Sequence, residues 1–349
     1  METILITGGL GYIGSHTTLK LLEKGKNILI IDSLENSTLD TLSKINFLIN
    51  SKGINKKKGI LYFRKGDLKN KIWLEKVFEE FIDSNKKISS VLHFAGLKSV
   101  EESIMYPLKY WDTNIGGTLN LLNTMIKNSC FTIIFSSSAM VYKINSMRPF
   151  KESHELDPLN PYAFTKYSIE KILYDLFNSA SSKWRIANLR YFNPVGAHES
   201  GILGENPKRE PSNLFPSLID SLKKKNKYFK IYGNDWPTPD GTCIRDFIHI
   251  MDLADAHIAA YEYITEGKAK INIFNIGTGH GTSILEIIKT FESVNKFSIQ
   301  YKYENRRTGD VPYLVADTNY ANEILNWKSK KKLEEICKDT WRWFNKNYK

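Results

Sequence analysis

The stretch Thr7-Gly-Gly-Leu-Gly-Tyr-Ile-Gly-Ser-His16 lies between a short apolar run, Ile4-Leu-Ile6, and a helical pattern that continues to Lys24. Within it, glycine recurs at every third position, at Gly8, Gly11 and Gly14. Glycines at a strand-to-helix junction permit a tight turn and let the backbone approach a pyrophosphate, which the free amides of the helix N-terminus can bind. A glycine pattern alone is weak evidence, but in this strand and helix context it predicts a dinucleotide site.

A second apolar run, Ile28-Leu-Ile-Ile31, ends at Asp32. In a dinucleotide-binding unit, the carboxylate at this point accepts hydrogen bonds from ribose hydroxyls. The same charge would repel a phosphorylated ribose. The sequence therefore predicts NAD, rather than NADP, as the cofactor.

Strand-like apolar runs alternate with amphipathic helical stretches over the first part of the chain. Strands are predicted at Ile4–Thr7, Ile28–Asp32, Leu61–Lys65, Val91–Phe94, Phe131–Ser136 and Ile186–Arg190. Helices are predicted at Tyr12–Lys24, Asn70–Ser84, Trp111–Lys127 and Tyr162–Ala180. This alternation predicts an α/β fold, a Rossmann-type doubly wound parallel sheet with helices on both faces. Ligands of such sheets bind at the carboxyl ends of the strands.

The sequence changes in character after Phe192, where prolines and glycines become more frequent. We predict an NAD-binding domain over residues 1–192 and a smaller C-terminal α/β domain over residues 193–349 that binds the substrate. A helical pattern returns at about residues 243–266, and we expect that segment to rejoin the first domain. A last helix is predicted at Leu333–Lys346.

Composition limits the classes of protein that this chain can represent. Its 349 residues, 42% of them hydrophobic, suffice for two packed domains. No apolar run approaches the about 20 residues needed to cross a bilayer, so no membrane association is expected. The three scattered cysteines show no metal-ligand spacing, so we expect no metal and a cytoplasmic location. The net charge of +11 comes from lysines dispersed without stacking aromatics, which argues against a nucleic-acid partner.

Tyr162 and Lys166 lie four residues apart in the run Asn160-Pro-Tyr-Ala-Phe-Thr-Lys166, so a helix would place them on one face. A free phenol has a pKa of about 10 and is a poor base at neutral pH. A nearby positive charge favours the phenolate, although lowering the pKa by about 3 units requires about 4 kcal/mol. We expect the lysine and a cationic nicotinamide to supply this together. Such a pair is commonly a solvated surface contact, and the dinucleotide motif is what favours a catalytic role.

The chain is similar to the extended short-chain dehydrogenase/reductases, and within that group it resembles the UDP-glucose 4-epimerase family. The likeness spans almost the whole length. The glycine motif and the Tyr/Lys pair indicate only the broader group, whereas two other runs point to the epimerases. These runs are Phe94-Ala-Gly-Leu-Lys98 and Leu189-Arg-Tyr-Phe-Asn-Pro-Val-Gly-Ala197.

The resemblance implies that the protein interconverts UDP-galactose and UDP-glucose with bound NAD. Tyr162 would take the proton of the sugar 4-hydroxyl while the hydride at C4 passes to NAD. The 4-keto sugar would rotate, and the hydride would return to its opposite face. Lys166 would bind the nicotinamide ribose and hold the tyrosine near its phenolate form. Ser138 would hydrogen-bond the same oxygen and relay the proton.

The family's contact positions carry over to residues of this chain. The implied cofactor contacts are Gly8, Gly11, Tyr12, Ile13, Gly14, Asp32, Asn36, Ser37, Asp67, Leu68, Phe94, Ala95, Gly96, Lys98, Thr113, Tyr162, Lys166 and Phe192. The implied contacts of the UDP-sugar are Ser138, Tyr162, Asn193, Asn213, Leu214, Tyr232, Arg245, Arg307, Asp310 and Leu314. The helices at Trp111–Lys127 and Tyr162–Ala180 resemble those that pair two subunits in the family, so a homodimer is expected.

Two rival functions stay open from the sequence: another NAD-dependent nucleotide-sugar epimerase or dehydratase, and a non-enzymatic NAD sensor. Dehydratases of this type place an Asp-Glu pair directly after the catalytic serine or threonine, where this chain has Ala139-Met140. Sensors often lose the tyrosine or the lysine, and both are present here. Lys143 stands where the family usually has glycine. Leu314 replaces a tyrosine that in relatives crowds the sugar C2 substituent, so we expect some turnover of UDP-N-acetylated hexoses.

Overall fold

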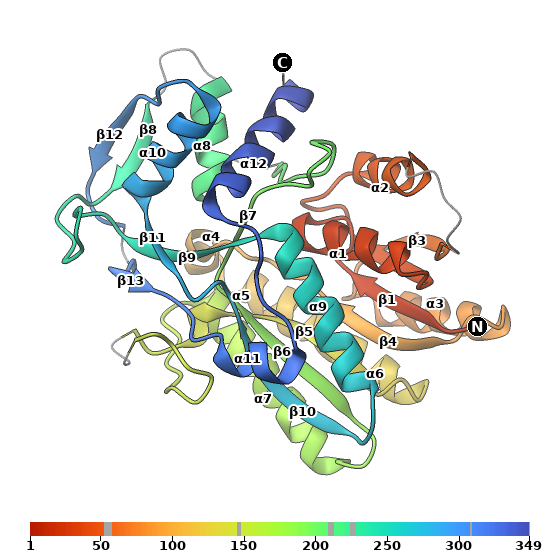
Figure 1. Cartoon of the computed structure of the whole chain (residues 1–349). Coiled ribbons are helices and arrows are strands. Elements are labelled where there is room, and N and C mark those ends of the chain that lie inside the picture. The colour runs from red at the N-terminus through yellow and green to blue at the C-terminus, as the bar shows by residue number, and fades with distance from the viewer. Residues whose placement is uncertain (52–57, 145–147, 209–212, 224–227, 308, 349) are drawn as a thin grey trace.

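The computed structural model describes residues 1–51, 58–144, 148–208, 213–223, 228–307 and 309–348. Its centre is a seven-stranded parallel sheet in the order β10-β6-β5-β4-β1-β2-β3 (Figure 1). The strands are β1 (Thr3–Thr7), β2 (Ile28–Asp32), β3 (Leu61–Lys65), β4 (Ile88–His93), β5 (Thr132–Ser138), β6 (Arg185–Tyr191) and β10 (Lys270–Ile276). The strand order reverses between β1 and β4, which is the doubly wound topology that the sequence predicts.

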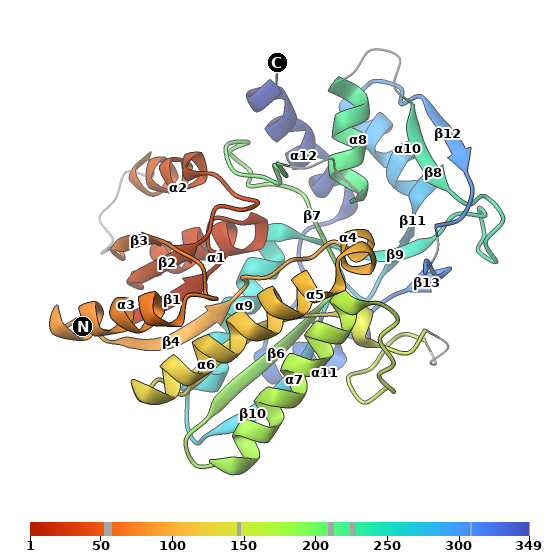
Figure 2. The same cartoon turned by 180° about the vertical axis from the view of Figure 1, so that it is seen from behind.

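Helices cover both faces of this sheet. One face carries α1 (Tyr12–Glu23), α2 (Leu39–Ser51), α9 (Ile250–Thr265) and α11 (Asn319–Leu325), and the other face carries α3 (Lys71–Asp83), α6 (Gly117–Lys127) and α7 (Pro161–Ser179), as Figure 2 shows from behind. Adjacent residues of β1 point to opposite faces: Ile6 belongs to the apolar cluster that contains Leu19 of α1, and Leu5 belongs to the one that contains Leu173 of α7. Burial on both faces explains why these strands are almost continuously apolar.

The structure confirms the predicted α/β class and adds elements that periodicity did not predict. These are α2, the short helices α4 (Val100–Met105) and α5 (Pro107–Tyr110), and the edge strand β10. The helix predicted at Trp111–Lys127 begins as a π-helix, η1 (Trp111–Gly116), before α6. Because π turns often accompany functional sites, η1 is a candidate part of the functional site.

The rest of the chain forms a smaller α/β unit. Strands β7 (Asn193–Val195), β9 (Ile244–His249), β11 (Gly281–Ser283) and β13 (Tyr313–Leu314) form a second sheet, and β8 (Phe229–Tyr232) pairs with β12 (Tyr301–Glu304). The helices α8 (Leu214–Lys223), α10 (Ile284–Asn295) and α12 (Leu333–Tyr348) pack around a separate apolar core. After β9 the chain returns from the smaller unit to the large sheet. There α9 packs on α1, and β10 pairs with β6.

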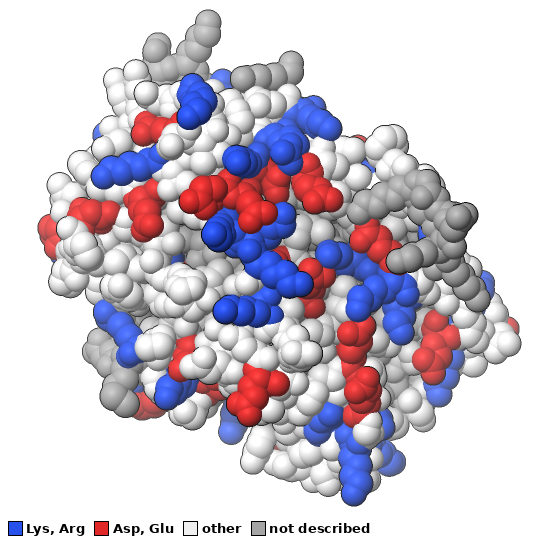
Figure 3. Space-filling view, viewed as in Figure 1, with Lys and Arg blue, Asp and Glu red and all other residues white. Residues whose placement is uncertain are grey.

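Charges of both signs are interspersed on the face shown in Figure 3. Many of them form ion pairs, such as Lys24 with Glu262 at 2.7 Å and Lys20 with Asp255 at 2.9 Å. Within the described ranges, no helix combines the length and the apolar character that crossing a bilayer requires.

Candidate active site

The carboxyl ends of β1, β4, β5 and β6 lie at one edge of the large sheet and face β7, β9 and β13 of the smaller unit (Figure 1). Because the strand order reverses between β1 and β4, this edge is open for ligands. Nearly all of the predicted site residues come from the strand ends and loops that border it.

The glycine-rich turn after β1 has the shape that a pyrophosphate needs. Gly8 has a φ of +67°, and a Cβ placed there would lie 2.8 Å from the Ala95 nitrogen. A Cβ on Gly14 would lie 2.4 Å from the Gly8 carbonyl oxygen. Only glycine therefore fits these two positions. The N-cap of α1, Gly11, makes no side-chain cap, and the first turn has no acidic residue, which leaves the helix N-terminus suited to an anion.

Asp32 at the end of β2 is held in a defined orientation and is 7% exposed. Its carboxylate accepts hydrogen bonds from the Leu10 and Leu34 amides, at 3.0 Å and 2.9 Å, and from the Ser37 hydroxyl at 2.7 Å. It lies directly beside the glycine turn, because Gly8 donates to the carbonyl of the preceding residue, Ile31. This is where a dinucleotide's adenosine ribose reaches a Rossmann-type sheet.

Other predicted cofactor contacts surround the same edge. Leu68, which is buried, follows Asp67 after β3, and the Asp67 carboxylate accepts from the Lys69 amide at 2.9 Å. Ile13, in the first turn of α1, packs against the core. Asn36 accepts from the Lys208 amide at 3.3 Å, and Thr113 is half-buried on η1. The structure thus brings the glycine turn, Asp32 and Ser37 into contact, and places Asp67 and Asn36 on neighbouring loops.

Tyr162 and Lys166 lie on successive turns of α7, as predicted. The Lys166 ammonium is buried, donates to the Ser136 carbonyl at 2.7 Å, and lies 5.9 Å from the centre of the Tyr162 ring. Ser138 ends β5 and caps the short turn η2 (Ala139–Val141) by accepting from the Met140 amide at 3.2 Å. These contacts bring the end of β5 and the first turns of α7 together at the open edge of the sheet.

Burial, a neighbouring hydroxyl and a neighbouring charge act on the pKa of Tyr162. Burial raises the pKa of Tyr162, while a hydrogen bond with Ser138 and the charge of Lys98 oppose that rise. Burial also lowers the pKa of Lys166 to about 8. Among the described residues, the charge that opposes the rise in the pKa of Tyr162 is that of Lys98.

Lys98 belongs to the loop that follows β4. Its ammonium forms an ion pair with Glu205 of the smaller unit at 2.9 Å, and its side chain is half-exposed. In the same loop, the Phe94 ring lies 4.8 Å from His257, and Ala95 approaches the glycine turn. The loop thus spans the distance between the glycine turn and the phenol.

Asn114 on η1 holds this loop in place, although sequence reasoning did not identify it. Its amide oxygen accepts from the Leu97 amide at 2.8 Å, and its nitrogen donates to the Leu97 carbonyl at 3.1 Å and to Thr165 at 3.0 Å. Gly96 permits the close approach, since a Cβ there would lie 3.1 Å from the Asn114 oxygen. The only signal in the sequence is an asparagine beside Gly116-Gly117 in a predicted helix.

The predicted substrate residues lie across the edge, mainly on the smaller unit. Arg245 of β9 forms an ion pair with Asp310 at 3.2 Å, and Leu314 of β13 is its register partner. The guanidinium of Arg307 stacks on the Tyr232 ring at 3.8 Å.

Of the remaining predicted ligand contacts, some have polar atoms that a ligand could reach, and others pack in apolar clusters. Asn193 of β7 has a buried side-chain oxygen without a hydrogen-bond partner among the described residues. The Asn213 amide lies 3.4 Å from Glu205. Leu214 packs against the core of the smaller unit, and Phe192 lies in an apolar cluster that Leu314 contacts.

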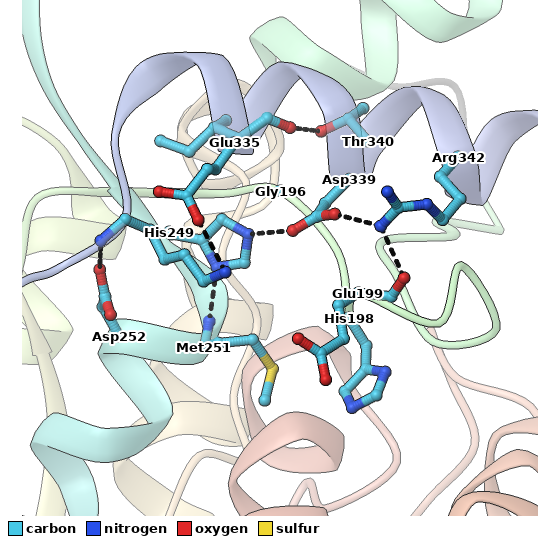
Figure 4. A network of polar contacts seen from close by, with 12 residues as sticks. Gly196, His198, Glu199, His249, Met251, Asp252, Glu335, Asp339, Thr340 and Arg342 are labelled. Atoms are coloured by element: carbon cyan, nitrogen blue, oxygen red, sulfur yellow. Dashed lines mark hydrogen bonds and ion pairs between the residues drawn. The ribbon is translucent and has the colours of Figure 1, made fainter.

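A polar network ties the glycine turn to the C-terminal helix. The Tyr12 hydroxyl donates to the Gly196 carbonyl at 2.7 Å, and a Cβ on Gly196 would lie 2.9 Å from the His249 ring. Figure 4 shows His249, at the end of β9, pointing toward Asp339 of α12, and their nearest atoms are 3.3 Å apart. Arg342 completes the network with an ion pair to Asp339 at 2.6 Å. The orientation of Tyr12 therefore depends on packing between the two units.

Comparison with known proteins agrees with this geometry. A family model described as GDP-mannose 4,6 dehydratase matches residues 5–340. The chain is 43% identical over 347 residues to a protein of Arabidopsis thaliana named bifunctional UDP-glucose 4-epimerase and UDP-xylose 4-epimerase 3, covering 99% of this chain and 96% of that protein. It is 42% identical over 344 residues to the UDP-glucose 4-epimerase of Bacillus subtilis, covering 99% and 97%. The chain belongs to the UDP-glucose 4-epimerase family.

A solved structure supports the same assignment. The crystal structure of UDP-glucose 4-epimerase from Bifidobacterium longum in complex with NAD+ and UDP matches with a TM-score of 0.90 at 39% identity, covering 99% of this chain and 98% of that one. The matching family model is named after a dehydratase, whereas the relatives that the chain matches over its length are epimerases. The position after Ser138, where dehydratases carry two carboxylates, is occupied by Ala139 and Met140.

Proposed function

We propose that this chain is a UDP-hexose 4-epimerase that interconverts UDP-galactose and UDP-glucose through a 4-keto sugar. The observation that carries the proposal is the placement of Tyr162 and Lys166, on the first turns of α7, beside the end of β5 with Ser138, at the strand edge that also holds the glycine turn. A base, its hydrogen-bond partner and a dinucleotide cradle are what a reversible oxidation at an alcohol carbon requires.

The residues around the glycine turn fit NAD. Gly8, Gly11 and Gly14 would hold the pyrophosphate at the N-terminus of α1, and Asp32 would accept the hydroxyls of the adenosine ribose. When bound, NAD supplies a reversible hydride acceptor for the sugar C4. Lys166, whose ammonium already contacts the Ser136 carbonyl, would bind the nicotinamide ribose beside it.

In the proposed reaction, side chains of this protein carry out the proton transfer. The Tyr162 phenolate would take the proton of the sugar 4-hydroxyl, and Ser138 would stabilise the oxygen through its hydrogen bond. After rotation of the 4-keto sugar, C4 would take the hydride back on its opposite face, and the same tyrosine would return the proton to the oxygen at C4. Because the proton and the hydride both return, the reaction needs no added oxidant or reductant.

The smaller unit would bind the UDP group. Arg245 and Arg307 suit a diphosphate, because a guanidinium can form two parallel hydrogen bonds with phosphate oxygens. Asp310, paired with Arg245 and 35% exposed at its side chain, would accept hydroxyls of the uridine ribose. The buried, unpartnered oxygen of Asn193 supports a ligand contact on β7. This scheme fits the predicted division into an NAD-binding and a UDP-sugar-binding domain.

We also propose that the protein is a homodimer. Figure 2 shows α4, α5, α6 and α7 on one face of the molecule. Large apolar side chains are exposed on these elements and between them, Tyr106 before α5 and Trp111 on η1 included: Ile104, Met105, Tyr106, Leu108, Trp111, Leu119, Ile126 and Phe164. An exposed patch of this kind is typical of a protein–protein interface, and a second copy of the chain would cover it symmetrically.

The free, buried cysteines, Cys130, Cys243 and Cys337, fit the proposed cytoplasmic location.

The experiment that tests the function is incubation with UDP-galactose without added reductant, with formation of UDP-glucose as the measurement. Tyr162→Phe should retain NAD and lose about 1,000-fold in kcat, since a positioned base contributes about 100- to 10,000-fold. Tyr174→Phe is the matched control, because this tyrosine of α7 is 50% exposed and remote from the strand edge. Wild-type protein that binds NAD but forms no UDP-glucose would favour the sensor, and a 4-keto-6-deoxy product would favour a dehydratase.

A further inference from the structure

A buried ion pair lies one helical turn beyond Lys166. Glu170 follows Lys166 by four residues and Tyr162 by eight, so the three side chains share one face of α7. The Arg190 guanidinium of β6 meets the Glu170 carboxylate with two hydrogen bonds, at 2.6 Å and 3.0 Å. Their side chains are 1% and 5% exposed. Burial of two charges carries a large desolvation penalty, so such a pair is poor evidence for stability and needs another explanation.

The pair is the centre of a network in which each charged group has further partners. Glu170 also accepts from the Ser137 hydroxyl of β5. Arg190 donates to the Tyr142 hydroxyl at 3.0 Å and to the Glu152 carbonyl at 3.1 Å. A network of this completeness fixes the relative positions of the elements that supply it.

The same network reaches a third strand and two described segments, residues 142–144 and 148–157. Asn275 of β10 is the register partner of Arg190, as Ser137 is on the other side. Its side chain accepts from the Tyr142 hydroxyl at 2.6 Å and donates to the Phe150 carbonyl at 2.7 Å. Tyr142 and Phe150 belong to the apolar cluster that also contains Phe192 and contacts Leu314, at the proposed nicotinamide and hexose positions.

We propose that Glu170 and Arg190 are positioning residues for epimerisation. The pair sets α7 against β6, and the Ser137 contact of Glu170 sets α7 against β5, which fixes Tyr162 relative to Ser138, one residue beyond Ser137. Through Tyr142 and the Glu152 carbonyl, it also holds residues 142–144 and 148–157 beside the apolar cluster of Phe192 and Leu314. Neither residue contacts the reacting atoms. The inference rests on the proposed function, because it concerns the alignment of the base with the sugar C4.

Three variants separate geometry from charge. Glu170→Gln keeps the shape and removes the charge, Arg190→Lys keeps the charge and removes the two-point contact, and Ser137→Ala removes one hydrogen bond without a large volume change. For Glu170→Gln and Arg190→Lys we expect kcat per bound NAD to fall at least about tenfold, since a displacement of about 1 Å can cost about 100-fold. KM for UDP-galactose should stay within about threefold, because the network does not touch the UDP-binding residues. Ser137→Ala should fold and show a smaller fall in kcat.

Two further readouts distinguish positioning from loss of folded protein. The isotope effect with UDP-galactose deuterated at C4 should increase in the variants, because hydride transfer becomes rate-limiting, and it does not depend on the fraction of active enzyme. Hydrogen exchange of Lys151–Asp157 should accelerate in the NAD-bound protein, since Arg190 no longer holds the Glu152 carbonyl. An unchanged kcat in variants whose melting temperature has dropped would overturn the inference and leave a structural role only.

Two matched controls come from the same chain. Glu80→Gln makes the same substitution in the Arg64–Glu80 pair, which also joins a strand to a helix but is exposed. Leu173→Ala removes apolar packing from α7 one turn beyond Glu170 without touching a polar group. Both should keep the wild-type kcat and isotope effect, the second despite a lower melting temperature. Wild-type protein without epimerase activity would instead refute the proposed function, which separates the two failures.

Discussion

The Lys166 ammonium lies 5.9 Å from the centre of the Tyr162 ring and donates to the Ser136 carbonyl instead of the phenol. The cation that favours the phenolate is Lys98, on the loop after β4. Lys98 is in turn paired with Glu205 of the smaller unit. The basicity of the tyrosine therefore depends on a contact between the two units as well as on its own helix.

Lys98→Met should impair catalysis more at acidic than at alkaline pH. Loss of its charge removes one of the two effects that oppose the raised pKa of Tyr162, so a higher pH is then needed to form the phenolate. We expect the ratio of wild-type to variant kcat to be about three to ten times larger at about pH 6 than at about pH 9. The measurement is a pH–rate profile at low ionic strength, because salt screens this half-exposed charge.

Glu205→Gln tests the same relationship with the opposite sign. It leaves Lys98 without its counter-ion, so the acidic limb of the profile should move to lower pH. A parallel shift of both variants in the same direction would contradict the electrostatic explanation. It would indicate that each substitution merely disturbs the loop after β4.

Leu314 should permit turnover of UDP-N-acetylglucosamine alongside UDP-glucose. Its side chain packs against the apolar cluster of Tyr142, Phe150 and Phe192, and its backbone pairs with Arg245. It thus lies between the proposed nicotinamide and diphosphate positions. Leu314→Tyr should raise the preference for UDP-galactose over the N-acetylated substrate by about tenfold or more, because a filled pocket rejects an additional group. Brisk epimerisation of UDP-galactose with no detectable turnover of the N-acetylated sugar in the wild type would refute the prediction.

Local patterns predicted the parts of the site that depend on neighbouring residues in the chain. The glycine turn, Asp32 and the Tyr162/Lys166 spacing each lie within one strand-to-helix unit or one helix, so a short stretch contains the whole signal. The six predicted strands are present for a similar reason, since buried parallel strands are almost continuously apolar.

Contacts between distant segments were not predictable in this way. Asn114 holds Leu97 from 17 residues away, Glu170 meets Arg190 across 20 residues, and Tyr142 meets Asn275 across 133. In the sequence, nothing near these polar residues distinguishes them from residues of the surface. The partner of each is fixed only when the strands are paired. The edge strand β10 escaped prediction because its sequence, Lys270-Ile-Asn-Ile-Phe-Asn-Ile276, interrupts the apolar run with polar residues.

The proposed dimer should depend on the exposed apolar face of α4 to α7. Leu108 of α5 is 81% exposed, and Leu108→Asp would place a charge in the interface. Because a stable interface buries about 1,600 Å² with a largely apolar centre, we expect the variant to be a monomer by light scattering. Phe47→Asp is the matched control, since Phe47 is 59% exposed on α2, which covers the opposite face of the sheet. A monomeric wild type, or a dimer unaffected by Leu108→Asp, would exclude this surface.

Acid should destabilise the protein from about pH 6.5 downward. Burial lowers the pKa of His16 and of His93 to about 3, and that of His257 to about 4, from an ordinary value of 6.5. Between these limits the unfolded chain binds more protons than the folded chain, so the free energy of unfolding falls as pH falls. Each histidine contributes at most about 1.4 kcal/mol per pH unit.

His93 offers the clearest test of this linkage. It is 1% exposed and bridges Thr7 of β1, at 2.7 Å, and Thr118 of α6, at 2.9 Å, and both its burial and the charge of Lys166 oppose its protonation. His93→Gln should therefore lower stability at neutral pH and reduce the slope of urea-unfolding free energy against pH by about one proton's worth between about pH 6 and pH 4. His280→Gln, at an exposed position, should leave the slope unchanged. Equal slopes in the wild type and in His93→Gln would mean that the buried ring does not resist protonation, and acid instability would then have to come from the carboxylates.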